Sequence, residues 1–169
     1  MRFFRGQITT IADEMVKALI AANFVEVTSE SQAEVVLDVE AVLKEYLRMQ
    51  RDVNEKAKDT VASRNLDYSQ LSKVRQEEAA RRGMSAPEDW LLKQLVEVML
   101  HSKNVDEVFG QDHELRRTMR DVLKRYADTE KELDRQVRAR IKNLQEGTTN
   151  WEIEYQRVMG DLKEQKRLD

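Results

Sequence analysis

The sequence predicts an all-α fold, a bundle of about six helices in two pseudo-equivalent three-helix halves, each with one long helix. Three observations lead to this prediction. Apolar residues recur at steps of three and four along most of the chain, as on one face of an α-helix. The 169 residues include one proline and five glycines, too few for a β-sandwich or barrel, which needs a turn signal every ~8–12 residues. The same order of helices also runs twice along the chain.

The first half begins with a helix over 8–22 and continues into a long helix. Residues 23–27 between them are β-prone but too short and isolated to make a sheet. A capping-box pattern, Ser31 followed by Glu34, predicts the start of the long helix. Its apolar seam has the four–three spacing of coiled coils, at Val35, Val39, Val42, Tyr46, Met49, Val53, Ala57 and Val61. A shorter third helix follows, and Gly83 is predicted to end it.

The second half repeats this order. Ser85 and Glu88 form another capping-box pattern, which predicts the start of a helix. A second long helix is expected to open near Asp112 and to end at Gly147. Its seam follows the same spacing, at Leu115, Met119, Val122, Tyr126, Thr129, Leu133, Val137 and Ile141. Thr149 is predicted to cap a last helix.

The two halves resemble copies of one another at an offset of 80 residues. Val-Leu-Lys-Glu-Tyr at 42–46 faces Val-Leu-Lys-Arg-Tyr at 122–126, four identities in five. Any two amphipathic helices can be brought into phase, but here one ungapped offset aligns two helices and the segment between them. A repeat of this size cannot bury its seam alone, so the two long helices are expected to pack against each other, antiparallel. We therefore divide the chain into a first helical repeat, 1–84, and a second, 85–169, packed together as one compact unit.

Composition and charge exclude several classes of protein. The longest run without a charged residue, 18–25, is far below the ~18 apolar residues that a membrane-spanning helix needs. The first residues lack the apolar core of a signal peptide, and the chain has no cysteine for disulfides or thiolate metal sites, so we expect a cytoplasmic protein. The net charge of -3 and the isoelectric point near 5.6 are not those of a typical nucleic-acid-binding domain.

No catalytic, cofactor-binding or metal-ligating residues are predicted, and no cofactor is expected. Glu97 and His101 lie one helical turn apart, a spacing that can chelate a metal, but a di-iron bundle uses Glu-x-x-His pairs and none occurs here. His113 is expected on a solvated surface. Neither histidine has a serine or cysteine partner at a recognisable nucleophile elbow, and there is no glycine-rich phosphate loop. The sequence therefore gives no sign of an enzyme.

A basic stripe on the second long helix is the candidate interaction surface. It consists of Arg116, Arg117, Arg120 and Lys124. Such a stripe is in most cases a solvated outer face, here offset by neighbouring acidic residues. The functional alternative is a contact with an acidic partner or a phosphate backbone. The first half has no matching stripe, so these residues are not part of the shared scaffold.

The aromatic residues are assigned mainly to packing. Four of them are expected to anchor the core or the flanking helices, namely Trp90, Trp151, Tyr155 and Phe109. Phe3 and Phe4 either staple the N-terminus to the bundle or stay exposed for a partner.

Both ends of the chain resemble a known family. Met1-Arg2-Phe3, leading into Gly6-Gln7-Ile8, is similar to the start of the bacterial domain-of-unknown-function family 507. The stretch 146–155, with its Glu-Gly and its Trp-x-x-x-Tyr, resembles that family's tail motif. Two tandem copies would cover most of the chain, with Tyr68 of the first copy standing where Trp151 stands in the second. The resemblance implies a helical bacterial protein and brings no activity with it.

These observations favour a soluble helical interaction or scaffold protein without catalytic activity. Its most favoured partner is another protein, and it is expected to be a monomer or a homodimer with no membrane association. The alternative is a nucleic-acid-associated helical protein that uses the basic stripe.

Overall fold

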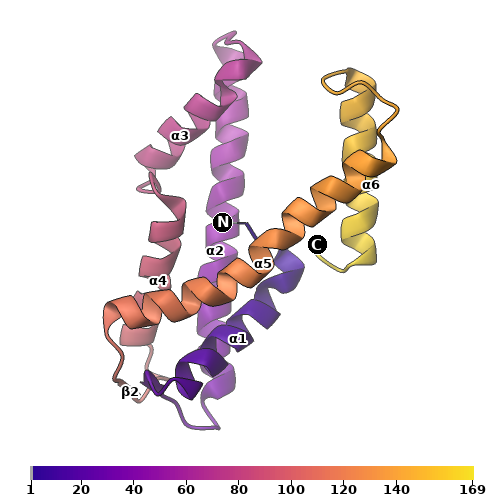
Figure 1. Ribbon diagram of the computed structural model, residues 1–169. Coiled ribbons are helices and arrows are strands. Elements are labelled where there is room, and N and C mark those ends of the chain that lie inside the picture. The colour runs from indigo at the N-terminus through magenta and orange to yellow at the C-terminus, as the bar shows by residue number, and fades with distance from the viewer. Residues whose placement is uncertain (1) are drawn as a thin grey trace.

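The computed structural model describes residues 2–169 and is built almost wholly from helices (Figure 1). Within these residues, the six α-helices are α1 (Ile8–Ala21), α2 (Gln32–Ser63), α3 (Leu71–Arg81), α4 (Pro87–His101), α5 (Asp112–Arg140) and α6 (Thr149–Gln165). Shorter elements are the 3-10 turns η1 (Arg5–Gln7) and η2 (Tyr68–Gln70) and the two-residue strands β1 (Val25–Glu26) and β2 (Glu107–Val108). The predicted all-α bundle with long helices α2 and α5 is confirmed.

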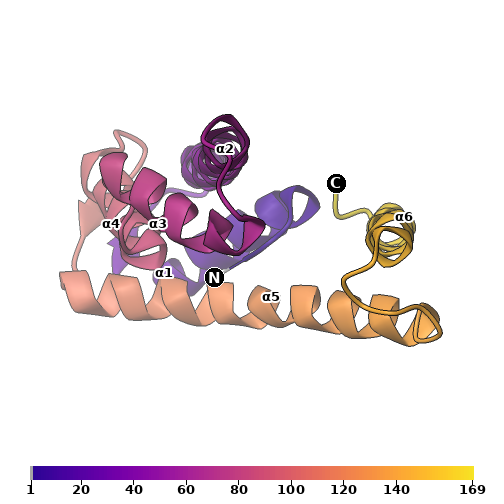
Figure 2. The ribbon, with the colours of Figure 1, turned by 90° about the horizontal axis from the view of Figure 1, so that it is seen from above.

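The two long helices do not pack along each other, so that expectation is wrong. Helices α1 and α4 each pack against both α2 and α5, and they hold the long helices apart (Figure 2). Helix α3 packs on α2, and α6 packs on α5. Most seam residues of α2 and α5 are still buried, because the short helices cover them, whereas Val42, Met49, Tyr126 and Thr129 are half-buried.

The apolar core is divided among three clusters. The central cluster joins α1 and α4 to the first halves of α2 and α5, and Tyr46 and Leu123 within it are fully buried. A second cluster lies between the end of α5 and α6, and a third lies between the end of α2 and α3. Each long helix thus contributes its first half to the common core and its second half to a separate helical pair (Figure 1).

Two residues of the segment 23–27, Val25 and Glu26, do form a strand, so the expectation that this segment makes no sheet is wrong. Strands β1 and β2 pair antiparallel, with Val25 opposite Val108 and Glu26 opposite Glu107. Residues more than eighty positions away supply the partner strand, which is why a short isolated segment could not reveal the pairing. The ribbon ties the α1–α2 loop to the α4–α5 loop.

Several helix ends differ from the predicted ones. Ser31 precedes α2 but has helical backbone angles, and its side chain makes no capping hydrogen bond. Helix α4 starts after Ala86, with Pro87 at its first position, so the Ser85 capping box does not form. Helix α5 ends at Arg140, and the last helix is capped by Thr148, whose side chain accepts a hydrogen bond from the Trp151 amide.

The ends of the chain meet each other. Phe3 is buried in the central core and stacks on Tyr46, with ring centroids 5.8 Å apart. Phe4 packs into the α5–α6 cluster beside Leu168. The Gly6 amide donates a 2.8 Å hydrogen bond to the Leu168 carbonyl. The N-terminal segment is therefore a staple, although Met1 of the predicted motif lies outside the described residues.

Two aromatic residues are not where the sequence predicts them. Phe109 is 63% exposed, because it follows β2 in the loop to α5 and does not lie on a helix face. Tyr68 is 73% exposed, whereas Trp151 is buried, so Tyr68 does not take the place of Trp151 in the first half. Among residues 2–169, the helices are all too short or too polar to span a bilayer.

Candidate functional site

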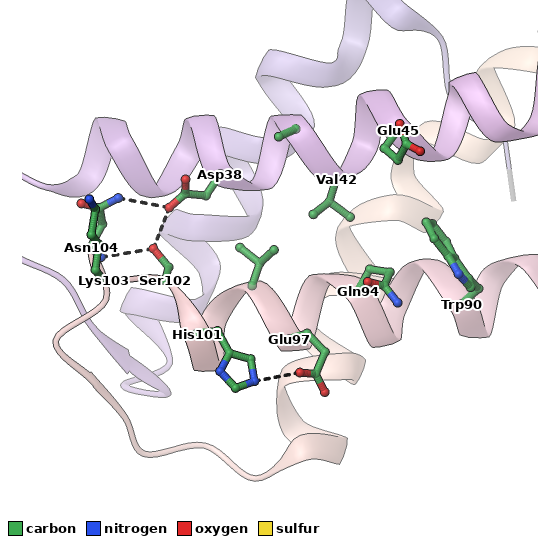
Figure 3. Close-up of a pocket in the computed structure, with 12 residues that line it drawn as sticks. Asp38, Val42, Glu45, Trp90, Gln94, Glu97, His101, Ser102, Lys103 and Asn104 are labelled. Atoms are coloured by element: carbon green, nitrogen blue, oxygen red, sulfur yellow. Dashed lines mark hydrogen bonds and ion pairs between the residues drawn. The ribbon is translucent and has the colours of Figure 1, made fainter.

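An open groove of about 640 Å³ runs between α2 and α4. Its α2 side is made by Asp38, Ala41, Val42 and Glu45. Its α4 side is made by Trp90, Gln94, Glu97, Val98 and His101, and the loop after α4 adds Ser102, Lys103 and Asn104. Figure 3 shows both rows of side chains along the groove. Its volume lies in the range of ligand-binding clefts, roughly 300–1,000 Å³.

Asp38 organises one end of the groove. Its Oδ2 accepts hydrogen bonds from Ser102 Oγ, at 2.6 Å, and from Asn104 Nδ2, at 3.2 Å (Figure 3). The backbone amide of Asn104 in turn donates a 3.2 Å hydrogen bond to Ser102 Oγ. These bonds anchor the end of α4 and its following loop against α2, so this end of the groove is preformed.

An aromatic stack fixes the other end. Trp90 stacks on the buried ring of Tyr46, with centroids 6.2 Å apart, and Tyr46 stacks on Phe3. Gln50 Nε2 donates a 2.7 Å hydrogen bond to the Tyr46 hydroxyl. Burial, followed by the charge of Glu88, raises the pKa of Tyr46 to about 12, so this hydroxyl stays protonated. Tyr46 therefore supports the core-facing side of the Trp90 ring, and Trp90 also lines the groove.

Negative charge predominates among the groove residues. Glu45 accepts hydrogen bonds of 2.8 and 2.6 Å from the Arg48 guanidinium, which hold the pKa of its carboxyl below the ordinary value. Glu97 Oε2 lies 2.9 Å from His101 Nε2. Asp38 is the third carboxylate, and Lys103 is the single lysine or arginine among the lining residues.

The contact between Glu97 and His101 lies at the surface. Both side chains are substantially exposed, at 47% and 75%. The described residues contain no group of three or more side chains of the metal-ligating types that could hold a metal ion. His113 is exposed near the start of α5, as expected.

The predicted basic stripe lies on α5 and contributes nothing to the groove. Two of its four members are engaged: Arg116 pairs with Asp112 at 2.9 Å, and Arg120 pairs with Glu88 of α4 at 3.1 Å. Arg117 and Lys124 are exposed, and neither makes an ion pair within residues 2–169. The interaction surface at Arg116, Arg117, Arg120 and Lys124 stays a prediction.

The side chains of the tail motif make intramolecular contacts. Tyr155 Oη donates a 2.5 Å hydrogen bond to Asp134, which also pairs with Arg138 at 3.0 Å. Arg138 pairs with Glu146 at 3.0 Å and lies 5.3 Å from the centre of the Trp151 ring, which stacks on Tyr155. Burial and the bond to Asp134 raise the pKa of Tyr155 to about 12. This network fixes α6 on α5.

The sequence did not predict the groove, although its α4 residues carried a signal. Trp90, Gln94, Glu97 and His101 follow one another at helical steps of three and four, on a face beside the buried one. Such spacing marks a shared face, but whether that face is covered depends on how far α2 lies from α4. That distance is set by the whole bundle.

A family model described as "Protein of unknown function (DUF507)" matches residues 1–168. No curated protein matches the chain.

Proposed function

Since the chain belongs to the DUF507 family, whose description assigns no activity, we propose from the molecule itself that it is a helical interaction protein that binds a partner protein in the groove between α2 and α4. The observation that supports this proposal is the groove's combination of an apolar floor with preformed ends. Val42 lies between the Asp38 cluster and Trp90 (Figure 3), and Ala41 and Val98 also line the groove.

The groove is a better docking surface than the rest of the bundle. Elsewhere, the apolar faces of α1, α4 and α5 are covered by one another. In the α1–α5 contact, Arg125 of α5 reaches Glu14 of α1 at 3.6 Å, which bridges the two helices. At the offset of eighty residues that relates the two halves, Glu45 corresponds to Arg125 and Gln94 corresponds to Glu14. Both Glu45 and Gln94 line the open groove. An interaction surface with fixed side chains loses less conformational entropy when a partner binds.

A single substitution in the groove tests the proposal. Ala41 is exposed on the groove floor, so Ala41→Arg adds a long side chain to the groove without entering the core. The partner is first identified by co-purification from the native host, and its affinity is then measured with purified proteins. We expect Ala41→Arg to weaken binding at least about tenfold, because the added side chain occupies the site.

Asp128→Arg is the matched control. Asp128 is exposed on α5, away from the groove, and the substitution also introduces an arginine on a helix surface. We expect it to change the affinity by less than about twofold. Unchanged binding in Ala41→Arg would overturn the proposal. Loss of binding on charge reversal of Arg117 and Lys124 instead would favour the stripe on α5 and the nucleic-acid alternative.

We also propose that the chain arose by tandem duplication in a bacterial protein and works in the cytoplasm. The helix contacts support the duplication, because they occur in exchanged pairs: α1–α2 with α4–α5, α1–α5 with α4–α2, and α2–α3 with α5–α6. An antiparallel ribbon joins the equivalent loops. The absence of cysteine supports a reducing compartment.

A further inference from the structure

We propose that the occupant of the α2–α4 groove is a cationic amphipathic helix of the partner protein, an inference that rests on the proposed function. The groove joins an apolar floor to acidic sides within one continuous surface. A helix with one apolar stripe and lysine or arginine on both flanks is complementary to this arrangement.

The dimensions of the groove suit a helix. Asp38 to Glu45 covers about 10 Å of α2, and Trp90 to His101 covers about 16 Å of α4, at 1.5 Å per residue. This length accommodates two to three turns of a partner helix, roughly the span of i, i+3, i+4 and i+7 anchors. Leu37 extends the apolar surface at one end, because it precedes Ala41 by one helical turn and is 53% exposed.

The charges in the groove favour a partner helix that carries positive charge. Asp38, Glu45 and Glu97 line it, and the α2 side offers no lysine or arginine among the described lining residues. Asp38 Oδ1 and Glu97 Oε1 have no hydrogen bond or ion pair within residues 2–169, because Asp38 accepts its hydrogen bonds through Oδ2 and Glu97 contacts His101 through Oε2. Each free oxygen is an acceptor for an incoming ammonium or guanidinium group. An acidic helix would meet repulsion at Asp38 and Glu97, whereas Arg48 offsets the charge of Glu45.

Trp90 adds a second reason for a cationic partner. Its ring is packed against Tyr46 on the core side and borders the groove beside Glu45 (Figure 3). A lysine or arginine beside Glu45 can lie against the indole face and pair with the carboxylate at once. The carboxyl of Glu45 is kept ionised by Arg48, which lowers its pKa.

Synthetic peptides test this inference directly. The probe is a helix of leucine and lysine with leucine at i, i+3, i+4 and i+7. Its controls are a scrambled peptide of the same composition and a version with glutamate in place of lysine. The chain has two tryptophans, so Trp151→Phe leaves Trp90 as the single fluorescent reporter in the groove. We expect saturable binding with a shift of Trp90 emission, at least about tenfold tighter for the probe than for either control.

Removing groove charges gives the decisive comparison. Asp38→Asn with Glu97→Gln should lower the affinity for the probe by about five- to tenfold. Asp121→Asn with Asp128→Asn removes the same charge from exposed positions on α5, and this double variant should change the affinity for the probe by less than about twofold. Equal losses in both double variants, or equal affinity for the lysine and glutamate peptides, would overturn the inference. If Asp38→Asn disturbs folding, Glu97→Gln alone serves, since Glu97 is an exposed side chain.

The two proposals fail separately. If Ala41→Arg abolishes binding of the cellular partner but the probe does not distinguish charge, the groove is the docking site and the partner has another chemistry. If the probe binds as expected and Ala41→Arg leaves the cellular partner bound, the proposed function is wrong and the chemistry of the groove stands.

Discussion

Gly6 is where the two ends of the chain meet, and its replacement by alanine tests how they are joined. An added Cβ would lie 2.1 Å from the Arg167 carbonyl oxygen and 2.8 Å from Leu168 Cα. Both are backbone atoms, which cannot rotate away as a flexible side chain would. The C-terminal residues therefore have to leave their position in the Gly6→Ala variant.

The cost follows from what the C-terminal residues lose. Leu168 is 6% exposed, and releasing such a side chain costs about 1.5–3 kcal/mol. The 2.8 Å hydrogen bond from the Gly6 amide to the Leu168 carbonyl contributes a further ~0.5–1.5 kcal/mol. We expect Gly6→Ala to lower the free energy of unfolding by about 2–4 kcal/mol.

Urea denaturation followed by circular dichroism measures this difference, and Gly160→Ala is the control. Gly160 lies inside α6 with nothing within 4 Å of an added Cβ, so alanine there should stabilise the protein by up to ~1 kcal/mol through its helix propensity. Proteolysis near the C-terminus should be faster in Gly6→Ala alone. A loss below about 0.5 kcal/mol in Gly6→Ala would refute the close packing of the two ends.

Two predictions concern Tyr46. Tyr46→Ala should lower the free energy of unfolding by about 3–5 kcal/mol, because the ring is fully buried between Phe3 and Trp90. The control is Tyr68→Ala, at a 73% exposed position, which should lower the free energy of unfolding by less than about 0.5 kcal/mol. The raised pKa of Tyr46, about 12, stabilises the fold fully below pH ~10, and the contribution falls as pH rises towards 12, by about 1.4 kcal/mol per unit. Unfolding at alkaline pH should therefore depend less steeply on pH in Tyr46→Phe, and an identical slope would contradict this assignment.

Helical periodicity predicted most of the fold because each helix is specified by local spacing. The start of α1 at Ile8 and the left-handed Gly83 both follow from residues within one or two turns. The capping predictions were less successful. Ser31 has the right side chain, but its φ of -90° and ψ of -10° are helical, so its hydroxyl cannot reach the first amides of α2.

The arrangement of the helices depends on contacts between distant residues. The seams of α2 and α5 suggested a direct contact, yet α1 and α4 cover them because their own apolar faces also need burial. The helical phase of Phe109 predicted an anchor of the core or of a flanking helix, but Phe109 lies in the loop after β2, which leaves it exposed. The groove likewise depends on the separation of α2 from α4, so Trp90 could be identified as an anchor but not as a wall of a docking site.

Photo-crosslinking locates the partner most directly. A photoreactive residue is placed at Ala41 or Gln94 in the groove, or at Lys124 or Asp128 on α5, in the protein expressed in its native host. We predict that the same partner is crosslinked from both groove positions and from neither α5 position. Crosslinks from α5 with none from the groove would contradict the assignment of the α2–α4 groove as the docking site.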